Sequence, residues 1–384
     1  LNGPANCAYL MEYIFRRKSV QMANDKGVLT PCNLYSTNLT DVDVFKGDGD
    51  AIRSTVLRAY QDGFRTIFVV GTCTPEIMGT DVGCEVSKMD LPDAGIIVVP
   101  ENKVFLGSKF GGFREAVFAL ASMIDRSRSV EPGTAAILSF EINCATHRGK
   151  KQNMDMFAEM LEDYGIRLKT FLRDITTIDE IRDLATCEHL IQISHGSMPD
   201  LMSKILFPER EVIVMDPPMS MDEIGEWCDM LSKLTGNRGN GYYERKKAEY
   251  DMEIARIRPQ TEGKKAVFYT RQDKKLNAQM DVLRDLGMEV SAIFSWPVLV
   301  EYHDPWDDRY PDVPRITGID ICRLRKECEK IGVDLIVSGD LRTGRTGFPW
   351  FRYPSQYLGM ECALEFSHRV RNAMIANPRL EWRD

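Results

Sequence analysis

Short apolar runs alternate along most of the chain with longer stretches in which apolar residues recur every three or four positions. The short runs are rich in Val, Ile and Phe, as buried strands are, whereas the longer stretches have the period of amphipathic helices. The predicted strands are 67–70, 96–100, 135–140, 168–172, 189–194, 211–215, 265–270, 290–294 and 333–338. The predicted helices include 50–60, 152–164, 178–185, 200–207, 222–234, 242–257, 276–286, 319–331 and 356–374. This alternation predicts an α/β fold with parallel sheets.

The length of 384 residues predicts two or three units of about 100–150 residues each. The charged helix at 242–257 follows a Gly-rich loop and is the best candidate for a connector between units. After it, residues 265–354 have the pattern of a further doubly wound unit. This unit carries Arg342 and Arg345 in a loop at a strand tip, where an anion clamp, a partner contact and a solvated basic loop are equally compatible with the sequence.

Composition excludes several classes of protein. The net charge is −8 and the pI is near 5.4, so the chain lacks the basic surface of a nucleic-acid-binding domain. No apolar run approaches the roughly 18 residues of a membrane helix, and we expect no signal peptide. The ten cysteines contain no C-x-x-C pair, which argues against zinc-ribbon and thioredoxin-type sites. We therefore expect a cytoplasmic protein whose cysteines are free, catalytic or metal-bound.

Cysteines stand at two positions where a helix is expected to begin. Cys73 comes three residues after the predicted strand at 67–70, and a polar, helix-starting segment follows it. Ligands of open α/β sheets bind at the carboxyl ends of strands, so Cys73 is a candidate soft metal ligand or nucleophile. The alternative is a small buried cysteine in a tight turn. Cys7 follows a Gly-Pro turn, where helix amides favour a thiolate, although a structural cysteine has the same pattern.

Other polar and aromatic positions are weaker candidates. Ser108 lies between a predicted strand and the following helix, in the same kind of place as Cys7 and Cys73. The Gly-Ser-Lys sequence around it lacks the spacing of a P-loop and so does not indicate a nucleotide site. Phe45 precedes Lys-Gly on a short, abruptly ended turn, either as an exposed aromatic or as an ordinary core residue.

One histidine and three late cysteines complete the candidates. His195 lies at a strand tip and suits either a metal ligand, an acid–base group or a hydrogen-bonded loop residue. Cys322 and Cys328 are six residues apart on one predicted helix, a spacing that does not place two thiols on one face. For these two cysteines and for Cys362 we expect core packing.

Four short blocks of sequence, in this order, resemble the nitrogenase component 1 family, and most closely its β-type subunit. The blocks are GPANCAY at 3–9, STNLTDVDVF at 36–45, GTCTPEIMGTD at 71–81 and FLGS at 105–108. The resemblance covers essentially the whole chain and implies three Rossmann-like, doubly wound α/β domains with parallel sheets. We expect these domains at residues 1–133, 134–260 and 261–384, with cluster ligands and the reductase-docking surface in the first.

The resemblance implies roles for four residues. Cys7 and Cys73 would ligate an iron–sulfur cluster, a P-cluster-like 8Fe-7S or 4Fe-4S group shared with the α-type subunit. Ser108 falls on the serine that neighbours this cluster, and Phe45 on the aromatic that helps dock the ATP-hydrolysing reductase. Thiolates are the usual ligands of such clusters. A further cysteine of β-type subunits would precede Leu1.

The implied function is that of a β-type subunit of a nitrogenase-like reductase, in a heterotetramer of two α-type and two β-type subunits. It would take electrons from an ATP-dependent, homodimeric iron–sulfur reductase and pass them to a cofactor of the α-type subunit, which is held there by a Cys and a His. Thr80 stands where the family often has Asp, and the chain is shorter than nitrogenase β subunits, which favours a methylthio-alkane reductase type. The alternatives are a non-catalytic scaffold for cofactor assembly, a tetrapyrrole reductase subunit and a general α/β ligand-binding module.

Overall fold

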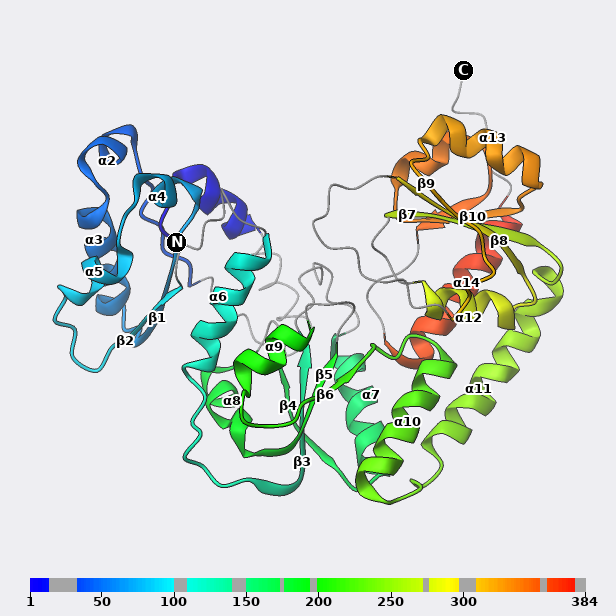
Figure 1. The fold of residues 1–384 in the computed structure, drawn as a ribbon, viewed down its shortest axis with the longest axis horizontal. Coiled ribbons are helices and arrows are strands. Elements are labelled where there is room, and N and C mark those ends of the chain that lie inside the picture. Colours follow the sequence, from blue (N-terminus) through cyan, green and yellow to red (C-terminus); the bar gives the residue numbers. More distant parts are fainter. Residues whose placement is uncertain are drawn as a thin grey trace. The chain divides into compact units, whose positions relative to one another are not determined.

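The computed structural model describes residues 1–13, 33–99, 109–139, 150–172, 176–193, 199–271, 276–296, 309–352 and 358–376 (Figure 1). The chain forms two compact units. The first consists of Leu1–Val130, Ile175–Thr186 and Asp200–Val212, and the second of Glu131–Asp174, Cys187–Pro199 and Ile213–Asp384. The domain boundaries expected at 133 and 260 stay predictions.

The first unit is built around two parallel strands. β1 (Thr66–Val70) and β2 (Gly95–Val99) pair in register from Thr66 opposite Gly95 to Val70 opposite Val99. Its helices are a first helix that includes residues 5–13, then α2 (Asp41–Lys46), α3 (Gly49–Gln61), α4 (Cys73–Met78), α5 (Val82–Ser87), α6 (Lys109–Ala121), α8 (Ile178–Arg182), η1 (Asp183–Thr186) and α9 (Pro199–Leu206). A small core of apolar side chains joins α3, β1 and α5; its buried members are Ile52, Val56, Val69 and Val82.

The second unit holds two separate parallel sheets. The four-stranded sheet has the order β4 (Arg167–Leu172), β3 (Glu131–Ser139), β5 (Cys187–Ile193) and β6 (Ile213–Met215). The five-stranded sheet has the order β11 (Trp350–Arg352), β10 (Leu335–Ser338), β7 (Lys265–Arg271), β8 (Glu289–Trp296) and β9 (Arg315–Thr317). In each sheet the first strand is internal and later strands add on both sides, which is the doubly wound arrangement.

Helices cover these sheets according to the alternation of strand side chains. On β7, Ala266 and Phe268 join a large core, whereas Val267 and Tyr269 join a smaller one on the other face of the sheet. The remaining helices are α7 (Lys150–Asp163), α10 (Met221–Thr235), α11 (Tyr242–Ile257), η2 (Arg258–Gln260), α12 (Asn277–Asp285), α13 (Ile321–Ile331), η3 (Leu341–Thr346) and α14 (Gly359–Ile375). Figure 1 shows α13 and α14 on opposite faces of the five-stranded sheet.

The fold class expected from the sequence is confirmed, since all strand pairs of the described residues are parallel and helices alternate with strands. Core packing is confirmed for Cys328 and Cys362, which are buried. It is wrong for Cys322, which is exposed because position 322 faces away from the sheet that buries Cys328. In the parts of the chain that the structure covers, every helix is too short or too polar to cross a membrane.

Candidate functional site

The residues at the start of the chain lie beside the carboxyl end of β1. Asn2 and Gly71 form a parallel bridge, in which the Asn2 amide donates to the Val70 carbonyl over 2.8 Å. The Asn2 carbonyl accepts in turn from the Thr72 amide over 3.0 Å. Strand pairing therefore continues past the last residue of β1, up to the residue that precedes Cys73.

A further stretch of backbone pairs with the same N-terminal segment. The Leu39 amide donates to the Gly3 carbonyl over 3.0 Å, and Pro4 forms a second parallel bridge with Leu39. Because successive residues of an extended chain direct their hydrogen bonds to opposite sides, residues 1–4 act as a short central strand. The stretches around Leu39 and Gly71 flank it.

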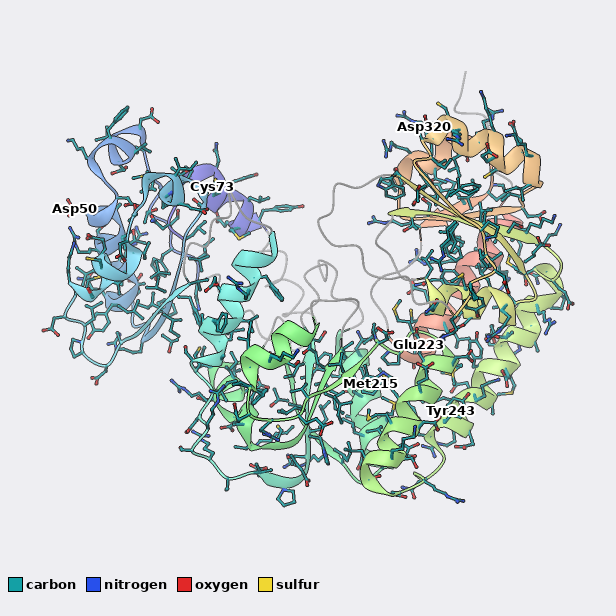
Figure 2. The ribbon with its side chains drawn as sticks, viewed as in Figure 1. Asp50, Cys73, Met215, Glu223, Tyr243 and Asp320 are labelled. Atoms are coloured by element: carbon teal, nitrogen blue, oxygen red, sulfur yellow. The ribbon has the colours of Figure 1, made fainter. Side chains whose placement is uncertain are left out.

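Both candidate cysteines lie in the first turn of helices that leave this ladder. α4 begins at Cys73, with Thr72 as its N-cap residue, and Figure 2 shows Cys73 at this helix start. Residues 5–13 are helical, and the Cys7 amide donates to the Pro4 carbonyl over 3.0 Å. Cys73 is exposed and Cys7 is half-buried. Each cysteine thus belongs to the first turn of a helix, in the position expected from the sequence.

The approach of the two segments requires a glycine at position 3. A Cβ atom on Gly3 would lie 2.4 Å from Thr72 Oγ1 and 2.7 Å from Thr72 Cγ2. Such distances are well inside van der Waals contact, so any side chain at position 3 displaces the turn before Cys73. Thr72 Oγ1 is buried and has no hydrogen-bond partner, which shows how tightly this turn is enclosed.

A buried polar network lies beneath the same turn. Asn2 and Asp48 are each 1% exposed, and Asn2 Nδ2 donates to Asp48 Oδ2 over 2.8 Å. The other carboxylate oxygen of Asp48 accepts from Thr80 Oγ1 over 2.6 Å. Asn2 Oδ1 accepts from Thr37 Oγ1 over 3.0 Å. The network therefore joins the segment before Cys7 to the turn that follows α4.

Residues 1–7, Thr37–Leu39, Asp48 and residues 70–80 form one corner of the first unit. The donor chemistry of this corner fits part of a thiolate-ligated cluster. Cys7 and Cys73 are soft donors, and both are free thiols in helix first turns that a single backbone ladder connects. Among the described residues, no three Cys, His, Asp or Glu side chains are placed to hold a metal ion. Two thiol donors are a set that suits one side of a shared cluster.

Phe45 lies on α2, close by in the chain, and its side chain is 91% exposed. The core position considered for it from the sequence is therefore wrong. The helix is short because Gly47, at a φ of 91°, ends it, and Thr40 begins it. The amide and the hydroxyl of Thr40 both donate to Asp43, and these bonds hold the Asp43 pKa below its ordinary value. The capping fixes a projecting aromatic side chain on a small, ordered helix.

Comparison with known proteins identifies the family. The model of the family described as "Nitrogenase component 1 type Oxidoreductase" matches residues 1–374. The chain belongs to the nitrogenase component 1 family.

Several relatives within this family are known by name. The chain is 25% identical over 313 residues to the nitrogenase iron-molybdenum cofactor biosynthesis protein NifE of Methanosarcina barkeri, covering 76% of this chain and 64% of the relative. It is 23% identical to NifE of Clostridium pasteurianum, covering 68% and 57%. It is also 23% identical to the nitrogenase molybdenum-iron protein alpha chain of Methanothermobacter thermautotrophicus, covering 96% and 78%. The chain thus spans less than two thirds of the length of the two NifE proteins.

Solved structures show the same fold. The structure titled "Nitrogenase Cp1 at pH 5" has a TM-score of 0.71 and 14% identity, covering 97% of this chain and 83% of that one. "Nitrogenase Cp1 at pH 6.5" has a TM-score of 0.67 and 16% identity, covering 97% and 87%. The nitrogenase component 1 fold expected from the resemblance is therefore confirmed.

The remaining candidates of this nitrogenase component 1 member divide into two groups. Ser108 and His195 lie outside the described residues. Arg342 is described, and its guanidinium binds the carboxylate of Asp340, with Nη2 2.6 Å from Oδ2. The pairing holds the Asp340 pKa below its ordinary value and leaves Arg342 with a partner inside its own loop.

Three residues of the corner escaped the sequence reasoning, namely Asn2, Asp48 and the hydroxyl of Thr80. Asn2 lies 46 residues from Asp48 in the sequence, and Thr80 lies 32 residues from it. A local sequence pattern does not predict contacts over such separations. The signal that was available is Gly3 next to Pro4, since a glycine before a helix start often marks a close backbone approach.

Proposed function

We propose that the chain is the β-type subunit of a nitrogenase-like reductase, with a methylthio-alkane reductase type as the first candidate. Cys7 and Cys73 ligate one side of an iron–sulfur cluster that an α-type subunit completes, with Ser108 beside it. Phe45 belongs to the surface that docks an ATP-dependent iron–sulfur reductase. Electrons pass from that reductase through the shared cluster to a cofactor of the α-type subunit.

One observation supports this proposal above the others. Two thiols, 66 residues apart in the sequence, start helices that leave the same end of one parallel ladder, and the Asn2–Gly71 bridge ties their segments together. A bound cluster supplies a group that accepts and releases single electrons. The protein's own part is to present the thiols from rigid backbone and to direct helix-terminal amides at the negative charge of the site.

The experiment is the iron and sulfide content of the complex after anaerobic purification, with its EPR spectrum. We expect Cys73→Ala to lose the cluster signal and to stay folded, because Cys73 is exposed and its removal opens no core cavity. The matched control is Cys322→Ala, which also removes an exposed cysteine from the first turn of a helix, α13. A Cys73→Ala complex that retains the signal would show that Cys73 is not a ligand.

The β-type assignment rests on the four sequence blocks, whereas one named relative is an alpha chain. The sequence of the co-purified partner tests it. We expect a second nitrogenase component 1 chain that carries the Cys and His ligands of the active-site cofactor. A preparation in which this chain pairs only with itself contradicts the β-type role.

A second candidate function is that of a scaffold on which a cofactor precursor is assembled. It is supported by the two relatives that are cofactor biosynthesis proteins. Turnover separates the two proposals. A reductase subunit gives ATP-dependent substrate reduction when its iron–sulfur reductase is added, and the Cys73→Ala variant lowers that rate. A scaffold purifies with a precursor cluster and reduces nothing under the same conditions.

A further inference from the structure

Asp48 occupies the N-cap position of α3, where an aspartate side chain normally accepts hydrogen bonds from amides of the first helical turn. Here the backbone carbonyl of Asp48 accepts from the Ile52 amide over 2.9 Å, but its side chain makes no cap bond. The carboxylate is directed elsewhere, and it is 1% exposed.

Both carboxylate oxygens of Asp48 are used by distant segments. Oδ2 accepts from Asn2, which is 46 residues away, and Oδ1 accepts from Thr80, which is 32 residues away. Asn2 is five residues before Cys7 and pairs with the backbone on either side of Gly71. Thr80 follows α4, which begins at Cys73. One buried carboxylate thus holds the ends of both cysteine-bearing segments.

We infer that Asp48 is the positioning residue that fixes the spacing of Cys7 and Cys73. This inference rests on the proposed function for the use of that spacing, but the spacing itself is a property of the chain alone. A carboxylate has two acceptor oxygens, so Asp48 accepts from the side-chain amide of Asn2 and from the hydroxyl of Thr80 at the same time. Without the Asp48 carboxylate, the segment before Cys7 keeps its backbone bridge but loses the buried hydrogen bond between Asn2 and the N-cap residue of α3.

Thr80 is a neutral partner for this carboxylate. The hydroxyl of Thr80 donates to Asp48 over 2.6 Å. A carboxylate at position 80 would place two negative charges at hydrogen-bond distance in a buried corner, and one of them would have to bind a proton. Threonine donates a hydrogen bond to Asp48 without adding a second carboxylate to this site.

Two substitutions of Asp48 separate positioning from helix capping. The Asp48 side chain makes no cap bond, so neither Asp48→Asn nor Asp48→Ser removes one from α3, and both place a residue that is favoured at an N-cap. The Asn side chain has the length of Asp: its oxygen accepts from Asn2 and its amide donates to Thr80. The Ser side chain is too short to reach either partner. Thr80→Val is a third variant, which keeps Asp48 and removes one of its two hydrogen bonds at constant shape.

The first measurement uses the full chain stripped of metal by a chelator. Bis-maleimides of increasing length are reacted with the thiols, and the Cys7–Cys73 cross-linked peptides are measured by mass spectrometry. We expect a narrow optimum of linker length in the wild type and in Asp48→Asn, and a broad distribution with a lower maximum in Asp48→Ser. A wild type without an optimum, or Asp48→Ser with the wild-type profile, overturns the inference.

The second measurement is iron content and EPR of the anaerobic complex. Loss of a residue that orients metal ligands typically lowers metal affinity by about 10- to 100-fold, and we expect a loss of this order for Asp48→Ser and a smaller one for Thr80→Val. Asp48→Asn should retain the wild-type iron content and EPR line shape. An Asp48→Asn complex as poor in iron as Asp48→Ser assigns the effect to charge and contradicts positioning. If the wild-type complex holds no iron, the proposed function fails, and the cross-linking profiles alone decide the inference.

Discussion

Replacing Gly3 with alanine tests the close packing on which the candidate site depends. The added Cβ would lie 2.4, 2.7 and 3.1 Å from Oγ1, Cγ2 and Cβ of Thr72. Two of the three substituents on Thr72 Cβ are heavy atoms, so every staggered rotamer leaves at least one of them facing residue 3. The clash is relieved only if the backbone of one segment moves, and overpacking of this kind typically costs about 1–3 kcal/mol.

The assay is amide hydrogen exchange of the ladder, because the segment can open locally while the rest of the unit stays folded. The Asn2 amide donates to Val70 and the Thr72 amide donates to Asn2, so both report on the docking of residues 1–4. A cost of about 1–3 kcal/mol corresponds to exchange about 5- to 150-fold faster at these amides. Iron content of the complex should fall in the same variant.

Two further variants decide whether the clash is the cause. Thr72→Ala removes Oγ1 and Cγ2 and leaves only the 3.1 Å contact, so Gly3→Ala/Thr72→Ala should recover at least half of the lost protection. Gly95→Ala is the matched control, since a Cβ there would approach nothing closer than 3.8 Å. Wild-type exchange rates in Gly3→Ala, or additive losses in the double variant, would refute the reasoning.

The remaining predictions concern one buried and one exposed side chain. Burial raises the pKa of Glu223, at the start of α10, from 4.5 to about 8. The folded chain thus keeps a proton that the unfolded chain loses, and the free energy of unfolding should fall as the pH rises from 4.5 to about 8. Glu223→Gln should remove most of this slope in urea titrations at pH 5 and pH 8, gaining at most about 5 kcal/mol at pH 8; an unchanged slope contradicts the assignment. Phe45→Ala should change the stability by less than about 0.5 kcal/mol but weaken binding of the reductase by about 2 kcal/mol or more. Leu341→Ala, which also truncates an exposed apolar side chain (70% exposed), is the control, and equal binding by both variants contradicts the docking role of Phe45.

Much of the fold follows from local pattern. All nine strands expected from periodicity are present, and helices such as α11 and α13 begin and end within two residues of their expected bounds. The strands that the pattern missed are β9 and β11, each three residues long and each at an edge of the five-stranded sheet. A short edge strand exists only through its one neighbour, and so its own sequence carries little periodic signal.

The site was predictable where its signals are local. A thiol after a strand and a thiol after a Gly-Pro turn were each expected at a helix start, and the structure places Cys73 and Cys7 there. The exposure of Phe45 and the Asn2–Asp48–Thr80 network were not decided by sequence, because solvent exposure and hydrogen bonds between distant segments depend on the tertiary fold. The same dependence explains Cys322, which shares a helix with the buried Cys328 but not its face.

Close packing and polar anchoring at this corner have a common cause. Residues 1–4 can lie against the turn before Cys73 only because Gly3 has no side chain, and the Gly-Pro sequence that permits this approach supplies little apolar surface to bury. Leu1 and Pro4 are only half-buried, so the segment gains less than the roughly 1.5–3 kcal/mol that a fully buried hydrophobic side chain contributes. Asn2 adds directional hydrogen bonds to Asp48 and Thr37. The geometry of these bonds fixes the position of the segment. A site that must hold two thiols at a set spacing benefits from such hydrogen bonds. Apolar contacts are non-directional and allow two segments to shift against each other, whereas a satisfied hydrogen-bond network fixes their relative position.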